Sequence, residues 1–428
     1  MIRSALRLTI ERLALEGDGV ARLEGRAVFV PGALPGDTVD ADVDIGQHVW
    51  RAEASRRVTP SPHRRPPACP IQSHCGGCAW MALDDTAQAR AKEEVLLSSL
   101  EHLGGISRST LEVRPWISPP PTLGYRRRAT LRWGPGGLGY SSRRTHAHVA
   151  VPACPVLVSE LSQWPAELSR ELGPIRDDIE LVQLLAEPNQ RAVALTLKGR
   201  VRSKVRAVAE ALVRSKRVAG VVLTPKFGAA ELIGKPTFRT LAPETQGVPL
   251  YLRPDVFCQA HAAAAPLLVG TAMELLAPEA THRVLELFSG SGLFTFALAA
   301  RAAAVVAVEG SSLAMALAQR SAREAGSKNV RFVQGEVRQV LAGLSKEKAT
   351  FDLLLADPPR TGDPTLGETA RRLGVRRVVY VACDAGALAR DAAALVKAGF
   401  RPGVLQGMDL FPQTHRLEAV MSFTRGVA

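Results

Sequence analysis

The sequence predicts an α/β protein in which a Rossmann-like, doubly wound domain follows a small OB-like β-barrel and an α+β middle domain. Three observations predict this order. From about residue 262 onward, strand-like and helix-like segments alternate, as in a parallel sheet with helices on both faces. Residues 1–58 hold short alternating apolar runs with Gly and Pro at the turns, which is typical of a barrel. Between them, strand-like and Arg-rich stretches mix irregularly.

The length and charge of the chain limit its class. A chain of 428 residues is long enough for about two or three domains, and we divide it into 1–58, 59–240 and 241–428. A formal net charge of +13 favours an anionic partner, nucleic acid first, although a basic solvated surface gives the same balance. No apolar run approaches the roughly 18 residues that span a bilayer, and charges interrupt the N-terminus before a signal-like core. We therefore expect a cytoplasmic monomer without membrane contact.

The segment that joins the barrel to the middle domain carries most of the cysteines. The stretch "VTPSPHRRPPACP" is rich in Pro and Arg and predicts an extended connector. Six cysteines are too few for a disulfide scaffold, and Cys69, Cys75 and Cys78 cluster, which indicates a reducing compartment and metal ligation. Residues 84–103 then predict a helix with Asp or Thr as its cap, ended by Gly104.

In the third domain, a Gly-rich turn predicts a nucleoside site. The strand "VLELF" leads into "SGSG", so Gly290 and Gly292 allow a tight turn close to a ligand. Glu309 ends the next strand at about the 20-residue spacing at which an acidic residue meets ribose hydroxyls. The third glycine of the dinucleotide fingerprint is missing, because Phe294 and Thr295 follow. S-adenosylmethionine therefore fits better than NAD, and the alternative is an ordinary strand-to-helix turn.

The stretch "LLLADPPRTG" narrows the chemistry. Asp357 ends a buried strand and is followed by two prolines, as in methyltransferases that alkylate exocyclic amines. Those enzymes place an aromatic residue next, to stack a flipped base, whereas this chain has Arg360. The sequence therefore favours methylation of a ring carbon over methylation of an amino group.

A lone cysteine and a late glutamate supply what ring-carbon methylation needs. Residues 378–382 predict a buried strand that ends at Cys383, although a free cysteine is often only a core residue. A thiolate that adds to carbon 6 of a pyrimidine makes carbon 5 nucleophilic, and a base must later remove the carbon-5 proton. We expect a turn or helix N-terminus to lower the thiol pKa. Glu418 is the candidate base; the alternative is an edge-strand glutamate paired with arginine.

Taken together, "DLFPQTHRLEAV", "ADPPRTG", "YVAC" followed by "LARD", and "VLELFSGSG" resemble the TrmA/RumA-type RNA uridine-5 methyltransferases over nearly the whole chain. Residues 9–40 are similar to the TRAM domain, an RNA-binding barrel that members acting on ribosomal RNA carry and that tRNA-specific bacterial members lack. The segments "YRRRATLRW" and "GYSSRRTH" are similar to central segments whose arginines, here 126–128 and 143–144, face RNA.

The resemblance implies a role for each matching residue. Cys383 would be the nucleophile and Glu418 the base, and Asp357 would also lie beside the target base. The positions implied to contact S-adenosylmethionine, together with the two glycines of the turn, are Gln259, Phe288, Gly290, Gly292, Glu309, Glu336 and Asp357. Cys258 matches no functional position, so we interpret it as core.

The resemblance also assigns the cysteine cluster. Cys154 would be a distant fourth ligand beside Cys69, Cys75 and Cys78. From ligand chemistry alone, four thiolates suit either zinc or an iron–sulfur cluster, and His74 is a further candidate ligand. The family pattern selects a [4Fe-4S] cluster, and we expect a structural role because methyl transfer needs no electrons.

Several positions depart from the family pattern. The family usually has Cys-Asn-Pro, whereas Cys383 is followed by Asp384 and Ala385, so a rigid proline is lost and a nearby carboxylate would oppose thiolate formation. Leu293 replaces a polar residue, Glu336 stands where Asn or Asp is usual, and His261 replaces an asparagine.

The leading hypothesis is methylation of carbon 5 of a uridine in RNA, with 23S ribosomal RNA as the first candidate and transfer RNA as an alternative. A second hypothesis is a catalytically impaired RNA-binding or assembly factor on the same scaffold, against which the presence of both Cys383 and Glu418 argues. Cytosine-5 methylation is weaker, because enzymes of that kind place a cysteine where this chain has Pro358.

Overall fold

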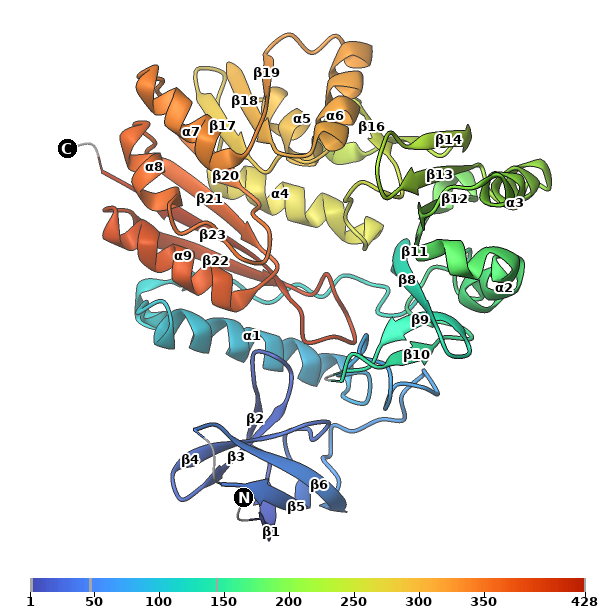
Figure 1. Cartoon of the computed structure of the whole chain (residues 1–428). Helices are drawn as coiled ribbons and strands as arrows, with labels where there is room; N and C mark the ends of the chain where they lie inside the picture. The colour runs from blue at the N-terminus through green and yellow to red at the C-terminus, as the bar shows by residue number, and fades with distance from the viewer. Residues whose placement is uncertain (1–2, 46–47, 144, 427–428) are drawn as a thin grey trace.

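The computed structural model describes residues 3–45, 48–143 and 145–426, and it confirms the α/β class. Three main sheets follow one another along the chain (Figure 1). The N-terminal barrel lies below a long helix, α1, the middle sheet lies to the right, and the large C-terminal sheet with its helices forms the upper left part. In the described residues, no helix is long and apolar enough to cross a membrane.

The barrel follows the predicted alternation of apolar and polar residues. In β5, Val39, Ala41 and Val43 are buried while their neighbours are more accessible, because successive side chains of a strand point to opposite faces. Its six-stranded sheet has the order β1-β5-β6-β4-β3-β2. The strands are β1 (Arg3–Thr9), β2 (Arg12–Leu13), β3 (Gly19–Leu23), β4 (Arg26–Val30), β5 (Thr38–Asp44) and β6 (Trp50–Thr59).

The helix predicted over 84–103 is α1 (Asp85–His102). As expected, an aspartate caps it: the Asp84 carboxylate accepts a hydrogen bond from the Ala87 amide at 2.7 Å. Val95, Leu96 and Leu100 belong to the same apolar core as the C-terminal strands. The helix therefore packs against the C-terminal domain although it precedes the middle sheet in sequence.

The middle domain is built on a seven-stranded sheet of order β10-β9-β8-β11-β12-β13-β14. α2 and α3 contribute to its main apolar core, and a two-stranded sheet, β15 with β16, follows it in sequence. The elements are β8 (Arg128–Gly134), β9 (Gly137–Ser141), β10 (His148–Ala150), α2 (Trp164–Glu171), β11 (Ile179–Glu187), β12 (Ala192–Gly199), α3 (Ser203–Arg214), β13 (Gly220–Pro225), β14 (Glu231–Gly234), β15 (Phe238–Leu241) and β16 (Pro249–Leu252).

The C-terminal sheet has the predicted doubly wound form, with the order β19-β18-β17-β20-β21-β23-β22-β7. The five strands from β17 to β21 are parallel, and β23 runs antiparallel to both of its neighbours. The elements are β7 (Glu112–Val113), α4 (Ala265–Leu276), β17 (Arg283–Leu287), α5 (Leu293–Ala299), β18 (Ala304–Glu309), α6 (Ser312–Ala325), β19 (Val330–Gln334), α7 (Val337–Lys346), β20 (Leu353–Ala356), α8 (Leu366–Arg372), β21 (Arg377–Ala382), α9 (Ala385–Lys397), β22 (Arg401–Met408) and β23 (Glu418–Thr424).

Two features of this sheet bear on function. The strand order reverses between β17 and β20, and such a reversal opens a crevice at the carboxyl ends of the strands, where doubly wound sheets bind ligands. In addition, β7 comes from the segment before the middle sheet and pairs with β22 as the last strand. The middle domain is thus inserted between β7 and the other strands of the C-terminal sheet.

Candidate active site

Strand register brings the predicted reacting groups to one edge of the C-terminal sheet. β17 and β20 pair Leu287 with Ala356, so Phe288 and Asp357 leave the sheet together. β21 and β23 pair Ala382 with Ala419, and the next step places Cys383 opposite Glu418. Because neighbouring strands lie about 4.8 Å apart, these side chains converge at the crevice.

A cavity of about 210 Å³ opens at this crevice. Of the predicted cofactor residues, Gln259, Phe288, Gly290 and Asp357 line it. Phe288 adopts a φ of +61°, a conformation that a non-glycine residue rarely occupies and that is concentrated at functional sites. The rest of the wall is mainly apolar and includes Leu293, which replaces a polar residue of the family pattern. The cavity suits a ligand with an apolar body and few polar groups.

The predicted turn and its acidic partner are joined directly. The Glu309 carboxylate accepts hydrogen bonds from the Gly290 amide at 2.9 Å and the Ser311 amide at 2.7 Å. Gly292, which caps α5, has a φ of +98°, and a Cβ there would stand 2.6 Å from the Phe296 ring, so only glycine fits. The Glu309 carboxylate therefore fixes the conformation of the turn.

Gly292, Glu309 and Glu336 are predicted cofactor residues that do not line the cavity, although Glu336 follows Gly335, whose amide donates to the Glu309 carbonyl at 3.0 Å. Glu336 lies at the N-cap position of α7 without a side-chain capping bond. Cys258 packs with Leu185, Ala194, Phe238 and Leu252 in a small apolar core, in agreement with its interpretation as core.

Three carboxyl groups near the cavity have raised pKa values. Burial, reinforced by the nearby Asp357, raises the pKa of Glu418 well above its ordinary value, and the Glu418 residue is only 2% exposed. Burial also raises the pKa of Asp357 to about 7. Sequence reasoning missed the third group, Glu286, which is fully buried on β17 with a pKa of about 8, mainly because of burial. In the sequence, Glu286 could have been recognised as a charged residue within an otherwise apolar strand.

The expectation of a lowered thiol pKa is wrong for Cys383. Burial, followed by the neighbouring Glu418 and Asp357, raises the pKa of this thiol to about 11, although Arg360 acts in the other direction. The helix that begins after it does not compensate, because Asp384 caps α9 by accepting a hydrogen bond from the Ala387 amide at 2.8 Å. A carboxylate at a helix N-terminus offsets the positive end of the helix dipole.

Two arginines complete the surroundings of the thiol, and sequence reasoning assigned neither to the site. Arg360 hydrogen-bonds the Cys383 side chain. Arg416 is partly buried, and burial together with Arg360 lowers its pKa. Both are within three residues of a predicted reacting group in the sequence, Asp357 and Glu418 respectively, which was the available signal.

A cleft of about 910 Å³ extends from these arginines. Its wall comes from all three parts of the chain and includes the barrel residues Leu15, Glu16 and Asp18. The basic residues in its wall include Arg126, Arg128, Arg143, Arg360 and Arg416. The cleft therefore offers closely spaced cations beside Cys383.

Neighbouring arginines of the middle domain serve different sites. Arg126 and Arg128 line the cleft, as predicted. Arg127 instead lines the cofactor cavity, donates a hydrogen bond to the Gln259 carbonyl at 2.9 Å and pairs with Glu187 at 3.5 Å. The prediction that all three face RNA is thus wrong for Arg127, because side chains of an extended segment alternate between faces. Residue 144, also predicted to face RNA, lies outside the described residues.

The barrel contacts the active-site region through the loop between β2 and β3. The Trp80 indole donates a hydrogen bond to the Gly17 carbonyl at 3.1 Å, and Arg143 donates one to the Glu16 carbonyl at 3.0 Å. Gly17 packs so closely that a Cβ there would stand 2.8 Å from the Cβ of His415. The loop is thus part of the cleft wall.

The four predicted ligand cysteines all line the cleft, and all are free thiols. Burial and the nearby Cys154, Cys75 and Cys69 raise the pKa of Cys78 to about 12, so the thiols lie within electrostatic reach of one another. Within the described ranges, no group of three or more His, Cys, Asp or Glu residues is arranged to hold a metal ion. The [4Fe-4S] assignment therefore stays a prediction.

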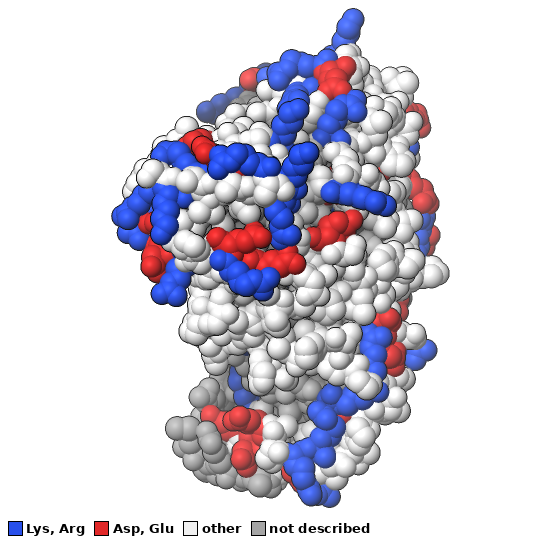
Figure 2. All heavy atoms as spheres, turned by 90° about the vertical axis from the view of Figure 1, so that its right-hand side faces the viewer, with Lys and Arg blue, Asp and Glu red and all other residues white. Residues whose placement is uncertain are grey.

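Basic side chains also occur away from the cleft. Figure 2 shows the side of the molecule on which α2 and α3 lie, with Lys and Arg gathered in its upper part and along its lower right edge, and Asp and Glu between them. In α3 the basic residues are Lys204, Arg206 and Arg214, the last two of which pair with glutamates. The net charge of +13 is thus distributed over several faces.

Comparison with known proteins gives consistent matches. The profile of the family described as tRNA (Uracil-5-)-methyltransferase matches residues 248–425, and the TRAM domain profile matches residues 1–46. The 23S rRNA (uracil(1939)-C(5))-methyltransferase RlmD of Pseudomonas fluorescens is 34% identical over 97% of this chain and 93% of its own length. The protein of the same name from Aeromonas hydrophila is 34% identical over 98% of this chain and 96% of its own length.

Among solved structures, a Pyrococcus abyssi tRNA (uracil-54, C5)-methyltransferase in complex with S-adenosyl-L-homocysteine has a similar fold. It covers 99% of this chain and 100% of its own, with a TM-score of 0.73 and 22% sequence identity. At that identity the likeness supports the arrangement of the three sheets and nothing finer.

Proposed function

The chain belongs to the RNA uracil-C5 methyltransferase family, and from that premise we propose that it methylates carbon 5 of a uridine in 23S ribosomal RNA. It is an S-adenosylmethionine-dependent transferase that carries an N-terminal TRAM domain. Ribosomal RNA is favoured over transfer RNA because the relatives named for 23S rRNA match nearly the full chain at 31–34% identity.

The register of β21 and β23 carries the proposed mechanism. It places Cys383 opposite Glu418, and the register of β17 and β20 places Asp357 at the mouth of the cofactor cavity. A uracil ring between the thiol and the cavity would present carbon 6 to sulfur and carbon 5 to the methyl donor. A nucleophile and a base beside one ring are the arrangement that carbon-5 methylation requires.

The proposed steps balance as follows. The Cys383 thiolate adds to carbon 6, and the electron pair of the 5,6 double bond moves toward the carbonyl oxygen on carbon 4. Carbon 5 then takes a methyl group; bound S-adenosylmethionine supplies it from a sulfonium. The Glu418 carboxylate removes the remaining proton from carbon 5, the double bond re-forms, and the thiolate leaves. The uridine gains one methyl group on carbon 5 and loses the proton that carbon 5 carried.

The raised pKa of Cys383 gives the neighbouring arginines a role in forming the thiolate. The resting Cys383 side chain is a thiol, since its pKa is about 11. Arg360 favours the thiolate, and Arg416 stands close enough to interact with both Arg360 and Cys383. Positive charge at this position would also stabilise the enolate oxygen that develops after attack. Asp384 does not disrupt the loop, because it is engaged as the cap of α9, which argues against the impaired-factor hypothesis.

The residues around the cavity fit a cationic nucleoside. Gln259, Phe288 and the Gly290 turn would hold the nucleoside, and Glu309 would remain available to ribose hydroxyls through its second lone pairs. Glu286 and Asp357 add potential negative charge beneath the cavity, which favours a sulfonium cation. Glu336 is proposed as a more distant contact.

We also propose that Cys69, Cys75, Cys78 and Cys154 hold a [4Fe-4S] cluster. Four thiolates on one zinc ion meet at a single atom through bonds of about 2.3 Å. In a [4Fe-4S] cluster each thiolate takes a different iron, so the sulfurs stand farther apart. All four cysteines line one cleft, which supports a shared ligand set, and the family resemblance favours the [4Fe-4S] cluster over zinc. The cluster would join residues 69–78 to Cys154 and so stabilise the cleft wall.

The substrate assignment is tested by mapping 5-methyluridine. Ribosomal and transfer RNA from a strain lacking the gene are digested and analysed by mass spectrometry. We expect one 23S uridine to lose its methyl group and to regain it when the wild-type gene, but not Cys383→Ala, is returned. Loss confined to transfer RNA would replace ribosomal RNA as the substrate, and no loss in either would overturn the proposed activity.

A further inference from the structure

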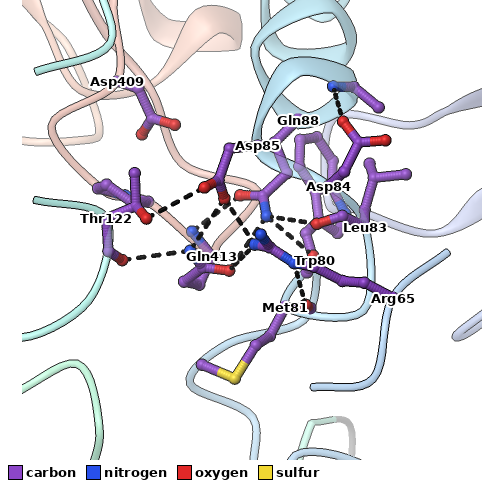
Figure 3. A network of polar contacts seen from close by, with 12 residues as sticks. Arg65, Trp80, Met81, Leu83, Asp84, Asp85, Gln88, Thr122, Asp409 and Gln413 are labelled. Atoms are coloured by element: carbon purple, nitrogen blue, oxygen red, sulfur yellow. Dashed lines mark hydrogen bonds and ion pairs between the residues drawn. The ribbon is translucent and has the colours of Figure 1, made fainter. Parts of the chain in front are cut away.

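A buried polar network joins α1 to the segment that carries the catalytic base. Residues 409–417 connect β22 to β23, and Glu418 follows them directly. In Figure 3, Gln413 from this segment points toward Asp85 and Gln88 of α1, with Arg65 and Thr122 beside it. None of these polar side chains takes part in the steps described above.

The Gln413 side chain uses its full hydrogen-bonding capacity. Its amide nitrogen donates to the Asp85 carboxylate and to the Thr122 carbonyl, both at 3.2 Å. Its amide oxygen accepts from Arg65 at 2.9 Å and from Gln88 at 3.1 Å. Two donors and two lone pairs are thus all engaged, which determines the orientation of the amide. The partners come from three separate segments of the chain.

The backbone of Gln413 is held in the same way. Its amide donates to the Gln88 side chain at 2.8 Å, and its carbonyl accepts from the Trp80 amide at 3.0 Å. The residue has an exposed fraction of 0% and a φ of +71°, in the left-handed region that side chains rarely adopt. Such a conformation is strained, and it persists where the surroundings impose it.

A second anchor grips the start of the segment. The Lys92 ammonium donates to the Asp409 carboxylate at 2.7 Å and to the Phe411 carbonyl at 3.1 Å, and the lysine has an exposed fraction of 0%. Asp85, Gln88 and Lys92 are spaced three and four residues apart, so they form one polar stripe along α1. The stripe holds the segment at its start, through Asp409, and at its middle, through Gln413, before Arg416 and Glu418 are reached.

We propose that Gln413 is a positioning residue for the catalytic base. It fixes the 409–417 segment so that Arg416 and Glu418, three and five residues later, stand beside Cys383. This inference rests on the proposed function and adds a role for the polar stripe of α1. Apolar packing would also bury the segment, but it would not determine one orientation, whereas a fully paired amide does.

The test follows the last chemical step, because that step depends on Glu418. If Gln413→Ala lets the segment shift, proton removal from carbon 5 slows and the methylated RNA stays bound to Cys383. We expect kcat to fall about 10- to 100-fold, as for a small misplacement of a catalytic group. The KM for S-adenosylmethionine should stay within about twofold. A covalent protein–RNA complex should accumulate with ordinary RNA and be visible on a denaturing gel.

Two further variants separate positioning from general stability. Asn329→Ala is the control: its side-chain amide also donates two hydrogen bonds, here to the Ala299 and Ala302 carbonyls at 2.8 and 3.1 Å, but at the amino ends of the strands, and it should give no covalent complex. Gln413→Glu loses the donor that faces Asp85, and adding Asp85→Asn supplies a donor from the other side. The double variant should recover at least part of the lost kcat.

The outcomes are distinct. A covalent complex in Gln413→Ala with recovery in the double variant supports the inference. If kcat falls only in proportion to the fraction unfolded, or if Asn329→Ala accumulates the same complex, the positioning role is overturned. The proposed function is checked separately: wild-type protein must form a stable complex with RNA that contains 5-fluorouridine, because fluorine replaces the proton that the base removes. Failure there would remove the premise and not the positioning role alone.

Discussion

The cofactor cavity and the cysteine-lined cleft meet at the same loop but are built differently. Asp357 lines the cavity, and Arg360, three residues later, lines the cleft. The cavity is mainly apolar and lies at the strand reversal of one sheet. The cleft is basic, and its wall comes from the barrel, the connector, the middle sheet and the 409–417 segment.

Because the two sites are built differently, we expect cofactor binding and RNA binding to depend on different parts of the chain. Cofactor binding relies on local turns such as the one that Glu309 holds and on a few middle-domain residues such as Arg127, so it should tolerate changes in the barrel and the connector. Handling of RNA relies on how several segments pack against one another, so it should respond to changes far from Cys383. Each prediction below changes a residue of one of these sites and measures the consequence.

The largest effect is expected for Cys383→Ala. Removal of the nucleophile should lower turnover by at least about 10³-fold, because the later steps depend on the covalent bond. Affinity for S-adenosylmethionine, measured by calorimetry, and for RNA, measured by filter binding, should change less than about threefold. Turnover at the wild-type rate would exclude covalent catalysis by this residue.

Glu418→Gln should lower turnover by about 10²- to 10⁴-fold, the range for loss of a general base, and should trap the covalent intermediate. It should also change stability in a pH-dependent way. Burial raises the pKa of Glu418 in the folded protein, so the folded chain binds more protons than the unfolded chain above the ordinary value of 4.5. Wild-type stability contributed by this group therefore falls as pH rises.

A glutamine resembles the protonated acid and avoids that loss. The variant should consequently unfold at a higher urea concentration than wild type at pH 8, and the difference should vanish near pH 4. Greater stability of wild type at pH 8 would show that the Glu418 carboxylate is well paired in the folded protein. As a control, Glu180→Gln changes an exposed carboxyl and should leave the midpoint unchanged at both pH values.

Cys75→Ser tests the cleft through its proposed cluster. Wild-type protein purified without oxygen should be brown and contain about four irons per chain, and the variant should lose both colour and iron. Its thermal midpoint should fall, because a cross-link between the connector and the middle domain is lost. Cys258→Ser, at a core cysteine that is not a proposed ligand, should keep the iron. Zinc without iron in wild type would contradict the cluster.

The smallest effect, and the sharpest comparison, comes from neighbouring arginines. Arg128→Gln should weaken RNA binding a few-fold and reduce the slope of log affinity against log salt by about 1, with a smaller change in cofactor affinity because Arg128 also lies over the ring of Phe257 at the cavity. Arg127→Gln should weaken binding of S-adenosylmethionine and leave RNA affinity and its salt dependence unchanged, because Arg127 supports Gln259 and lines the cavity. Equal effects of both variants on RNA would show that the two sites are not separate.

The sequence predicted much of the cofactor site. Gly290, Glu309 and Asp357 sit in motifs whose residues are close together in the chain, and strand-to-helix turns of this kind have few conformations. The alternation of elements likewise predicted the doubly wound sheet. Arg127 shows the limit even here, because one step along an extended segment decided which site it serves.

The sequence by itself determined the chemistry available to the protein: a thiol, a late carboxylate, a nucleoside turn and three clustered cysteines with a distant fourth. Only the tertiary structure decided the protonation of that chemistry, since burial and the approach of Glu418 and Asp357 raise the pKa of Cys383 against the expectation from its helix. It alone joined Gln413 to Asp85, more than three hundred residues away. Local motifs follow from the geometry of a few bonds, whereas electric fields and buried hydrogen bonds depend on every segment that packs around them.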